Sequence, residues 1–315
     1  MTLIGGKLLK IAIIGIGGVG GYFGAKLAHK YVPTREHSIF FLARGEHLAE
    51  IKRNGLSVIT QESDFTAIPT VATDNVKDLG LLDLVFFCVK TYDLENTARQ
   101  LIDNVHENTV VVTLLNGVDN AERLKAILPK GHVLNGYVYI HSFIQAPGVI
   151  KQVGGFRQLT FGPENGDPEK YQYIEDLLRN ADIKAELTAD ISVQVWTKYI
   201  FVGPLGTITS LLQKPLGAII EDDKSRQMLE GLTAEVMLIA KKREIILPED
   251  IISSSLEKVS RFSYDATTSI QRDFEKGRKT ELEAFTGYIV KSGKELGVET
   301  PLYQEAYNEL LTRLS

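Results

Sequence analysis

A glycine-rich run near the N-terminus is the clearest chemical signal in the sequence. Gly15, Gly17 and Gly20 form a G-x-G-x-x-G pattern that directly follows an apolar stretch and opens a helix-like segment. Gly15 permits a tight turn, Gly17 lets the backbone approach a pyrophosphate, and Gly20 lets the helix pack closely on the strand. Gly18 and Val19 complete the first helical turn, whose free N–H groups would bind the phosphates. The pattern predicts a dinucleotide site; a purely structural glycine turn is the alternative.

The residue after the second expected strand indicates which dinucleotide is bound. NAD enzymes place an acid at this position to bind the ribose hydroxyls, whereas this sequence has Arg44. A guanidinium stays charged and can bind a 2′-phosphate through two hydrogen bonds. We therefore expect a preference for NADP(H). A solvated surface arginine is the alternative, and the nearby Glu46 keeps NAD open.

Two further polar residues follow later strands. Lys90 comes after the apolar run 84–89, and Asn116 with Gly117 comes after the run 109–115. Ligands in such sheets bind beyond the carboxyl ends of the strands. Lys90 can contact cofactor phosphate, ribose or a substrate carboxylate, and Asn116 can hydrogen-bond near the nicotinamide. Strand-end turn residues are the alternative for both.

An isolated lysine lies in the second half of the chain. Between Asp190 and Lys214 the only charged residue is Lys198. Such a lysine must extend to water, pair with a charge, or lose solvent and have its pKa lowered. A desolvated ammonium beside a carbonyl can polarise the oxygen and deliver a proton as a hydride arrives, which is general-acid catalysis.

Glu281 is the acidic residue that could act with this lysine. It follows Thr280 in Thr280-Glu-Leu-Glu283, which has the form of a capping box. An acid in a first helical turn is also favoured by the helix dipole alone. The functional alternative is that Glu281 receives a substrate hydroxyl or balances the charge of Lys198.

The order of apolar segments predicts an α/β protein with two domains. Short apolar runs that alternate with helix-like segments favour a mainly parallel, doubly wound Rossmann-type sheet covered on both faces. The expected strands are 10–15, 38–43, 84–89, 109–115 and 133–139, with a hairpin or two added strands within 145–166. Later segments indicate helices at 221–243, after Pro248, at 284–296 and from Pro301. We expect an NADP-binding domain over 1–188 and an all-helical substrate and dimerisation domain over 189–315.

Composition excludes several classes of protein. The 315 residues include 44% hydrophobic and 24% charged side chains, typical of a globular protein. The net charge of -5 argues against nucleic-acid binding. The single cysteine, Cys88, fits a reducing compartment, and the histidines lack metal-ligand spacing, so we expect a cytoplasmic protein without a metal. The stretch 191–213 contains a lysine and a proline, which argues against a membrane span.

Taken together, these residues resemble the ketopantoate reductase (2-dehydropantoate 2-reductase) family over nearly the whole chain. The matching segments are GIGGVG at 15–20, Arg44, 89–91, 115–118, 147–150, 161–163, 196–198 and 277–281. The order and spacing of these segments together carry the resemblance.

The resemblance implies NADPH-dependent reduction of ketopantoate to (R)-pantoate, on the route to pantothenate and coenzyme A. It implies an active site in a cleft between a Rossmann domain and a helical domain. By matching motif, Lys198 is the proton donor, Glu281 binds the substrate hydroxyl, and Asn116 lies near nicotinamide and substrate. Arg44 binds the 2′-phosphate and Lys90 lies in the cofactor cleft. A further residue, Ser269, matches a serine that helps to hold the substrate carboxylate. The oligomeric expectation is a homodimer.

Three positions depart from the family pattern. Val202, Gly206 and Ala266 stand where the family usually has asparagines that line the substrate site. Loss of these amides would remove several hydrogen bonds, each worth ~1 kcal/mol net. The alternatives are a paralogous reductase of another 2-oxo acid, a non-catalytic NADP(H)-binding regulator, and a dehydrogenase of the 6-phosphogluconate or hydroxyisobutyrate type.

Overall fold

The structure is a computed structural model that describes residues 7–154, 156–260 and 262–314. The described chain divides into two compact units. The first contains the residues up to Leu115 together with Asp119–Ile191, and the second contains Asn116–Val118 together with the chain from Ser192 onwards. Each unit is described separately below.

An eight-stranded sheet forms the centre of the first unit. Its strand order is β12-β11-β8-β7-β6-β1-β2-β5. The strands are β1 (Lys10–Ile14), β2 (Ser38–Leu42), β5 (Val71–Thr73), β6 (Leu82–Phe87), β7 (Val105–Thr113), β8 (His132–Tyr139), β11 (Gln158–Gly162) and β12 (Lys184–Leu187). The six strands from β5 to β8 are parallel, and β11 runs antiparallel to β8. The order reverses between β1 and β6, so the predicted doubly wound Rossmann topology is confirmed.

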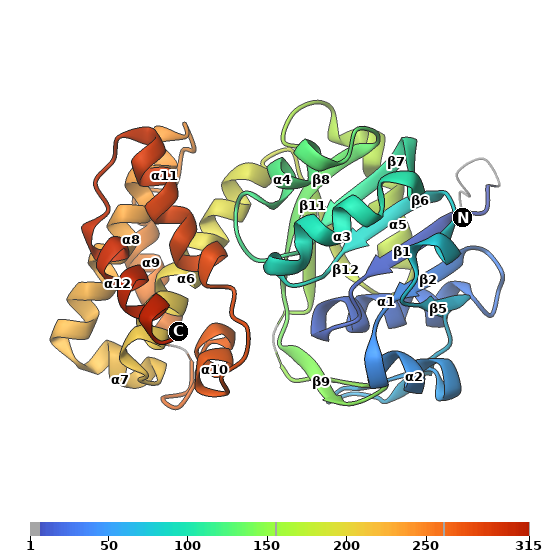
Figure 1. The fold of residues 1–315 in the computed structure, drawn as a ribbon, viewed down its shortest axis with the longest axis horizontal. Coiled ribbons are helices and arrows are strands. Elements are labelled where there is room, and N and C mark those ends of the chain that lie inside the picture. The colour runs from blue at the N-terminus through green and yellow to red at the C-terminus, as the bar shows by residue number, and fades with distance from the viewer. Residues whose placement is uncertain (1–6, 155, 261, 315) are drawn as a thin grey trace. The chain divides into compact units, whose positions relative to one another are not determined.

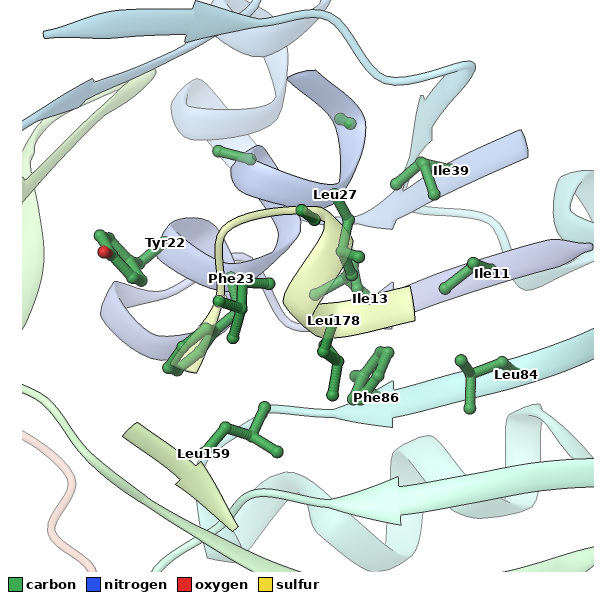
Figure 2. Close-up of a cluster of buried hydrophobic side chains, with 14 of the residues drawn as sticks. Ile11, Ile13, Tyr22, Phe23, Leu27, Ile39, Leu84, Phe86, Leu159 and Leu178 are labelled. Atoms are coloured by element: carbon green, nitrogen blue, oxygen red, sulfur yellow. The ribbon is translucent and has the colours of Figure 1, made fainter. Parts of the chain in front are cut away.

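Alternating side chains of β1 show why both faces of this sheet are buried. Ile11 and Ile13 pack into one core cluster, whereas Ala12 and Ile14 pack into a second one. The first cluster is covered by α1 (Gly18–Tyr31) and α5 (Gln172–Asn180), and Figure 2 shows Tyr22, Phe23, Leu27 and Leu178 meeting the sheet there. The second is covered by α3 (Leu94–Gln100) and α4 (Asn120–Ile127).

A smaller four-stranded sheet, in the order β4-β3-β10-β9, completes the first unit. Its strands are β3 (Leu56–Ile59), β4 (Phe65–Ala67), β9 (Ser142–Ala146) and β10 (Val149–Gln152). The two added strands expected within 145–166 are confirmed as β10 and β11, and β10 also forms an antiparallel hairpin with β9, which begins before the expected range. Helix α2 (Gly45–Asn54) lies beside this sheet, where His47 Nδ1 accepts a hydrogen bond from the Gly148 N–H at 3.0 Å.

Two of the predicted strands begin and end earlier than expected. The expected strand 84–89 is Leu82–Phe87, and the expected strand 109–115 is Val105–Thr113. The residues after these strands are apolar but lie outside the strands, so an apolar pattern alone places the strand ends too late. The short strands β3, β4, β5 and β12 have too few alternating residues to be recognised by pattern.

The second unit is helical in its described residues. Its helices are α6 (Ile191–Leu212), α7 (Leu216–Glu221), α8 (Asp223–Lys242), α9 (Ile251–Ser260), α10 (Ser269–Glu275), α11 (Tyr288–Leu296) and α12 (Pro301–Thr312). Figure 1 shows α11 and α12 packed beside α8. In the part of the chain that the structure describes, no helix combines the length and apolar character needed to cross a bilayer.

The expected capping box at Thr280 is wrong. The Thr280 hydroxyl is buried without a hydrogen-bond partner, and Glu283 instead accepts a hydrogen bond from the Tyr307 hydroxyl at 2.6 Å. The first helical hydrogen bonds run from Ala284 and Phe285 to the Glu281 carbonyl, and the turn Glu283–Gly287 is π-helical. The helix therefore begins one residue later than the motif predicts, because Tyr307 on α12 binds the carboxylate that the capping box requires.

The start of α12 depends on a buried carboxylate from α8. Glu235 accepts hydrogen bonds from the backbone N–H groups of Leu302 (2.8 Å) and Tyr303 (3.0 Å). These are first-turn donors that have no partner within the helix. Burial raises the pKa of Glu235, while the two N–H groups act in the opposite direction.

We expect Glu235→Ala to lower the free energy of unfolding by about 1–2 kcal/mol, as for loss of a strong helix cap. The measurement is urea unfolding followed by circular dichroism. Glu305→Ala removes an exposed carboxylate from α12, the helix that Glu235 caps, and should change stability by no more than about 0.5 kcal/mol. Equal effects of the two substitutions would contradict the assigned role of Glu235.

Candidate active site

The glycine loop lies at the switch point of the large sheet. It links β1 to α1, and the Gly15 N–H donates to the Leu42 carbonyl on β2 while the Cys88 N–H beyond β6 donates to Ile14. Gly15 has a φ of 96°, a conformation that L side chains rarely adopt. A Cβ on Gly20 would clash with the Gly15 carbonyl oxygen, so Gly20 is required by close packing.

Gly17 differs from these two glycines because its surroundings are open. A Cβ built on Gly17 meets no atom within 4 Å. Gly17 is the N-cap of α1, and the first helical hydrogen bond runs from the Gly21 N–H to the Gly17 carbonyl. The N–H groups of Gly18, Val19 and Gly20 lie before this first bond in the chain, so they have no acceptor within the helix. Open space beside a helix N-terminus with free donors fits the pyrophosphate of a dinucleotide.

Arg44 follows β2 and is the N-cap of α2. Its side chain is 81% exposed and donates a hydrogen bond to Asp93 Oδ2 at 3.1 Å. Asp93 ends the short turn Thr91–Asp93 beyond β6, and the Asp93 N–H donates to the carbonyl of Lys90. The structure therefore brings Arg44 and the Lys90 turn to the same end of the sheet, next to the glycine loop. Because the Arg44 guanidinium is exposed and its ion pair with Asp93 covers little of it, the guanidinium remains accessible to a phosphate.

Lys198 lies on α6 and is buried, with 7% of its surface exposed. Its ammonium Nζ donates a hydrogen bond to Asn116 Oδ1 at 2.8 Å. Asn116 belongs to a three-residue segment of the second unit whose next residue, Gly117, has a φ of 106°. Two residues that are 82 positions apart in the chain thus form one polar contact.

Burial governs the chemistry of this lysine. It lowers the pKa of Lys198 to about 8, and the negative charge of Glu281 opposes that shift. Glu281 is itself buried, with 5% of its surface exposed, and it lies two residues before the π-helical turn Glu283–Gly287. π-Helical turns are rare and are often found at functional sites. The structure therefore places Lys198, Asn116 and Glu281 in one electrostatic group.

Ser269 is the first residue of α10 and is exposed. Thr268 caps that helix, and its hydroxyl hydrogen-bonds the Thr209 hydroxyl on α6 at 2.8 Å. The Ser269 segment is therefore attached to the helix of Lys198. Among the described residues, the Ser269 side chain forms no hydrogen bond with Lys198, Asn116 or Glu281.

Two positions that depart from the expected asparagines are filled by packing. A Cβ on Gly206 would lie 2.8 Å from Phe285 and 2.9 Å from Ile270, so a longer side chain has no room there. Val202 packs on the cluster of Ile270, Ala284 and Phe285. The third position, Ala266, accepts a hydrogen bond from the Leu216 N–H through its carbonyl.

Within the described ranges, no group of three or more His, Cys, Asp or Glu side chains is arranged to hold a metal ion. Cys88 lies under the glycine loop, where burial raises the pKa of its thiol. Raised thiol pKa values are typical of structural rather than nucleophilic cysteines.

Comparison with known proteins identifies the family. Residues 11–166 match the family described as "Ketopantoate reductase PanE/ApbA", and residues 190–313 match its C-terminal part, "Ketopantoate reductase PanE/ApbA C terminal". A solved 2-dehydropantoate 2-reductase from Porphyromonas gingivalis W83 is 32% identical, with a TM-score of 0.85 over 97% of this chain and 100% of that chain.

Two curated relatives are more distant in sequence. The uncharacterized oxidoreductase YkpB of Bacillus subtilis is 26% identical over 303 residues, covering 96% of this chain and 98% of its own. A 2-dehydropantoate 2-reductase of Nostoc sp. is 26% identical over 307 residues, covering 96% and 94%.

A Rossmann sheet with this glycine loop, joined to a helical unit with a buried lysine, defines a dinucleotide-dependent oxidoreductase. The chain belongs to the ketopantoate reductase family, whose members are NADP-dependent oxidoreductases.

Sequence reasoning missed two contributors to this region. Asp93 pairs with Arg44, and its only sequence signal is an acid three residues after the strand-end Lys90. Phe285 fills the space over Gly206 and also accepts, through its carbonyl, a hydrogen bond from the Tyr199 hydroxyl at 2.9 Å. The absence of a side chain at position 206 was a visible signal, but its partner was not identifiable from spacing.

The contrast between Gly20 and Gly17 yields a stability test. Gly20→Ala forces the loop to move and should lower the free energy of unfolding by about 1–3 kcal/mol, the range for overpacking. Gly17→Ala adds a methyl group to open space at a φ of -90° and should change stability by less than about 0.5 kcal/mol. Thermal unfolding of both variants is the measurement, and a larger loss for Gly17→Ala would refute this account of the loop.

Proposed function

We propose that this chain reduces a branched 2-oxo acid of the ketopantoate type to the (R)-2-hydroxy acid, using NADPH. The observation that supports this proposal most strongly is the buried Lys198, hydrogen-bonded to Asn116 and balanced by the charge of Glu281. A buried cation that serves only stability is costly, because desolvation opposes its charged form. A proton donor for a carbonyl oxygen accounts for that cost.

In the proposed site each half of the reaction has its own residues. The cofactor, when bound, supplies the hydride to the carbonyl carbon. Gly17, Gly18, Val19 and Gly20 hold its pyrophosphate, Arg44 holds the 2′-phosphate, and Lys90 lies beside the same sheet edge. We infer that Asn116 contributes to both the cofactor and the substrate side.

Lys198 performs the proton step. Its ammonium donates a hydrogen bond to the substrate carbonyl oxygen and transfers a proton as that oxygen becomes an alkoxide, which leaves the hydroxyl of the product and a neutral amine. With a pKa of about 8, the amine is roughly nine-tenths protonated at pH 7. It is therefore both available as an acid and more acidic than an exposed lysine.

Asn116 and Glu281 control where that proton is held. Asn116 Oδ1 accepts a hydrogen bond from Nζ and fixes the position of the amine. The charge of Glu281 limits the loss of basicity that burial causes. Ser269, at the exposed start of α10, is proposed to bind the substrate carboxylate. We also propose a cytoplasmic homodimer.

Removal of the proton donor tests this function. Lys198→Ala should lower kcat by ~10²-fold or more with ketopantoate, while leaving the Kd of NADPH nearly unchanged. Because Lys198 must be protonated, wild-type kcat/KM should fall tenfold per pH unit above about pH 8. Steady-state NADPH oxidation and a fluorescence titration of NADPH are the measurements.

The controls separate this proposal from a regulator. Lys198→Arg retains the positive charge but does not titrate below about pH 12. The decrease in kcat/KM above about pH 8 should therefore disappear in this variant. Binding of NADPH without oxidation by any 2-oxo acid would overturn the catalytic assignment and favour a non-catalytic NADP(H)-binding protein.

The cofactor preference follows from Arg44. Arg44→Ala should weaken NADPH binding by about tenfold to a hundredfold through loss of charge-assisted hydrogen bonds, and should leave NADH binding nearly unchanged. Arg53→Ala on the same helix removes an exposed arginine paired with Glu50 and is the matched control. Equal wild-type affinity for NADPH and NADH would contradict the proposed role of Arg44.

A further inference from the structure

One histidine of the first unit joins the glycine loop to the helix that follows Arg44. His47 lies in the first turn of α2, three residues after Arg44, and is half-buried. Its Nδ1 atom accepts a hydrogen bond from the Gly148 N–H at 3.0 Å, and the Ile16 carbonyl of the glycine loop lies close enough to the ring to affect its pKa. The imidazole therefore connects three segments, which are α2, the glycine loop and the turn between β9 and β10.

The hairpin of β9 and β10 packs tightly against the other two segments. At the start of β9, the Ser142 carbonyl would overlap a Cβ built on Gly18, the first residue of α1. At the turn, a Cβ on Gly148 would lie 2.6 Å from Glu50 on α2, and Gly148 has a φ of 71°. Because the hairpin backbone is in direct contact at both places, a displacement of the Gly148 turn would also displace the first turn of α1.

The hydrogen bond from Gly148 defines the protonation state of the ring. A ring nitrogen that accepts a hydrogen bond carries no proton, so His47 is neutral and its proton is on Nε2. Nε2 is buried and has no hydrogen-bond partner of normal geometry among the described residues. A second proton would have to bind Nδ1, where it would break the contact with Gly148. Burial lowers the pKa of His47, and the Ile16 carbonyl acts in the opposite direction.

The segments that pack against His47 differ in their charge. Its own helix contributes the charged side chains of Arg44, Glu46 and Glu50. The glycine loop (15–20) and the turn 146–149 contain no ionisable side chain. Protonation of the ring is therefore coupled to burial and to the Gly148 contact rather than to a charge on the opposing segments.

We propose that neutral His47 is a positioning residue for the cofactor, which sets the separation between the glycine loop and Arg44. This inference rests on the proposed NADP(H) site, in which Gly17 lies at the pyrophosphate and Arg44 at the 2′-phosphate. Both phosphates belong to one ligand, so the spacing of the two protein groups decides whether both are bound without a further cost in ordering. Protonation of His47 releases the Gly148 turn and weakens the site.

Binding of NADP⁺ at two pH values tests the inference. NADP⁺ is the probe because NADPH decomposes in acid, and calorimetry gives its Kd without turnover. Binding requires the neutral ring, so the Kd should rise as the pH falls through the pKa of His47, which lies below the usual value for histidine. Between about pH 7.5 and about pH 5, the Kd of the wild type should rise about threefold or more beyond that of His47→Asn.

The comparison with His47→Asn isolates the histidine, because the 2′-phosphate itself changes charge near pH 6 in both proteins. Asparagine can accept the Gly148 N–H but does not titrate, so its Kd at pH 7.5 should stay within about threefold of the wild type. His47→Leu leaves that N–H unpaired and should weaken binding about tenfold at both pH values. If the leucine variant does not fold, the asparagine variant alone decides the question.

His37→Asn is the matched control. His37 is also half-buried, and its Nδ1 accepts the Leu9 N–H at 3.3 Å. Burial lowers the pKa of His37 as well, with Glu36 opposing. His37 directly precedes β2, at the end of that strand opposite to Arg44. The substitution removes a comparable titrating ring away from the glycine loop, so the Kd of NADP⁺ should keep its wild-type dependence on pH.

A nitrogen NMR spectrum of the histidine rings in the free protein gives a measurement that needs no cofactor. At pH 7.5, His47 should carry its proton on Nε2. A proton on Nδ1, or the same pH dependence of the NADP⁺ Kd in the wild type and His47→Asn, would overturn the inference and leave the proposed NADP(H) site intact. Failure of both NADP⁺ and NADPH to bind at any pH would overturn the proposed function and the inference with it.

Discussion

Burial of one ammonium group is the constraint on which the helical unit depends. A lysine placed among apolar side chains loses hydration, and its charged form survives only with a hydrogen-bond acceptor and a nearby negative charge. Asn116 supplies the acceptor and Glu281 the charge. The segment Asn116–Val118 accordingly belongs with the helices even though it follows a strand of the sheet. A single desolvated amine therefore links α6, the start of a π-helical turn and a strand-end segment.

The sheet unit is organised by a different constraint, which is close approach of backbone to backbone. Gly15 needs a positive φ, and Gly20 must pack against the Gly15 carbonyl, whereas Gly17 lies beside open space. Glycines in the same motif therefore perform different tasks, two in the fold and one at the surface offered to a ligand. The order of the parallel strands brings Arg44 and Lys90 to the carboxyl-end edge where this open space lies.

Beyond Lys198, one side of α6 is defined by the packing of apolar side chains. The space beside Gly206, which has no side chain, is filled by the ring of Phe285 and a methyl group of Ile270. The region is therefore close-packed rather than hollow. The chemistry at Lys198 and the shape beyond it are therefore separable properties. The first depends on charge and desolvation, and the second on the volumes of a few apolar side chains.

The sequence by itself determined the Rossmann-type fold class, the glycine loop and the isolated lysine, because these depend on local periodicity, backbone freedom and the scarcity of charge around residue 198. It failed at Thr280, where Tyr307 on a distant helix binds Glu283 and displaces the expected cap. It also could not show that Asn116 meets Lys198, that Asp93 pairs with Arg44, or that Phe285 covers Gly206. Each of these contacts joins residues far apart in the chain. Such contacts form only when the helices and strands pack together, and a local sequence pattern does not specify how they pack.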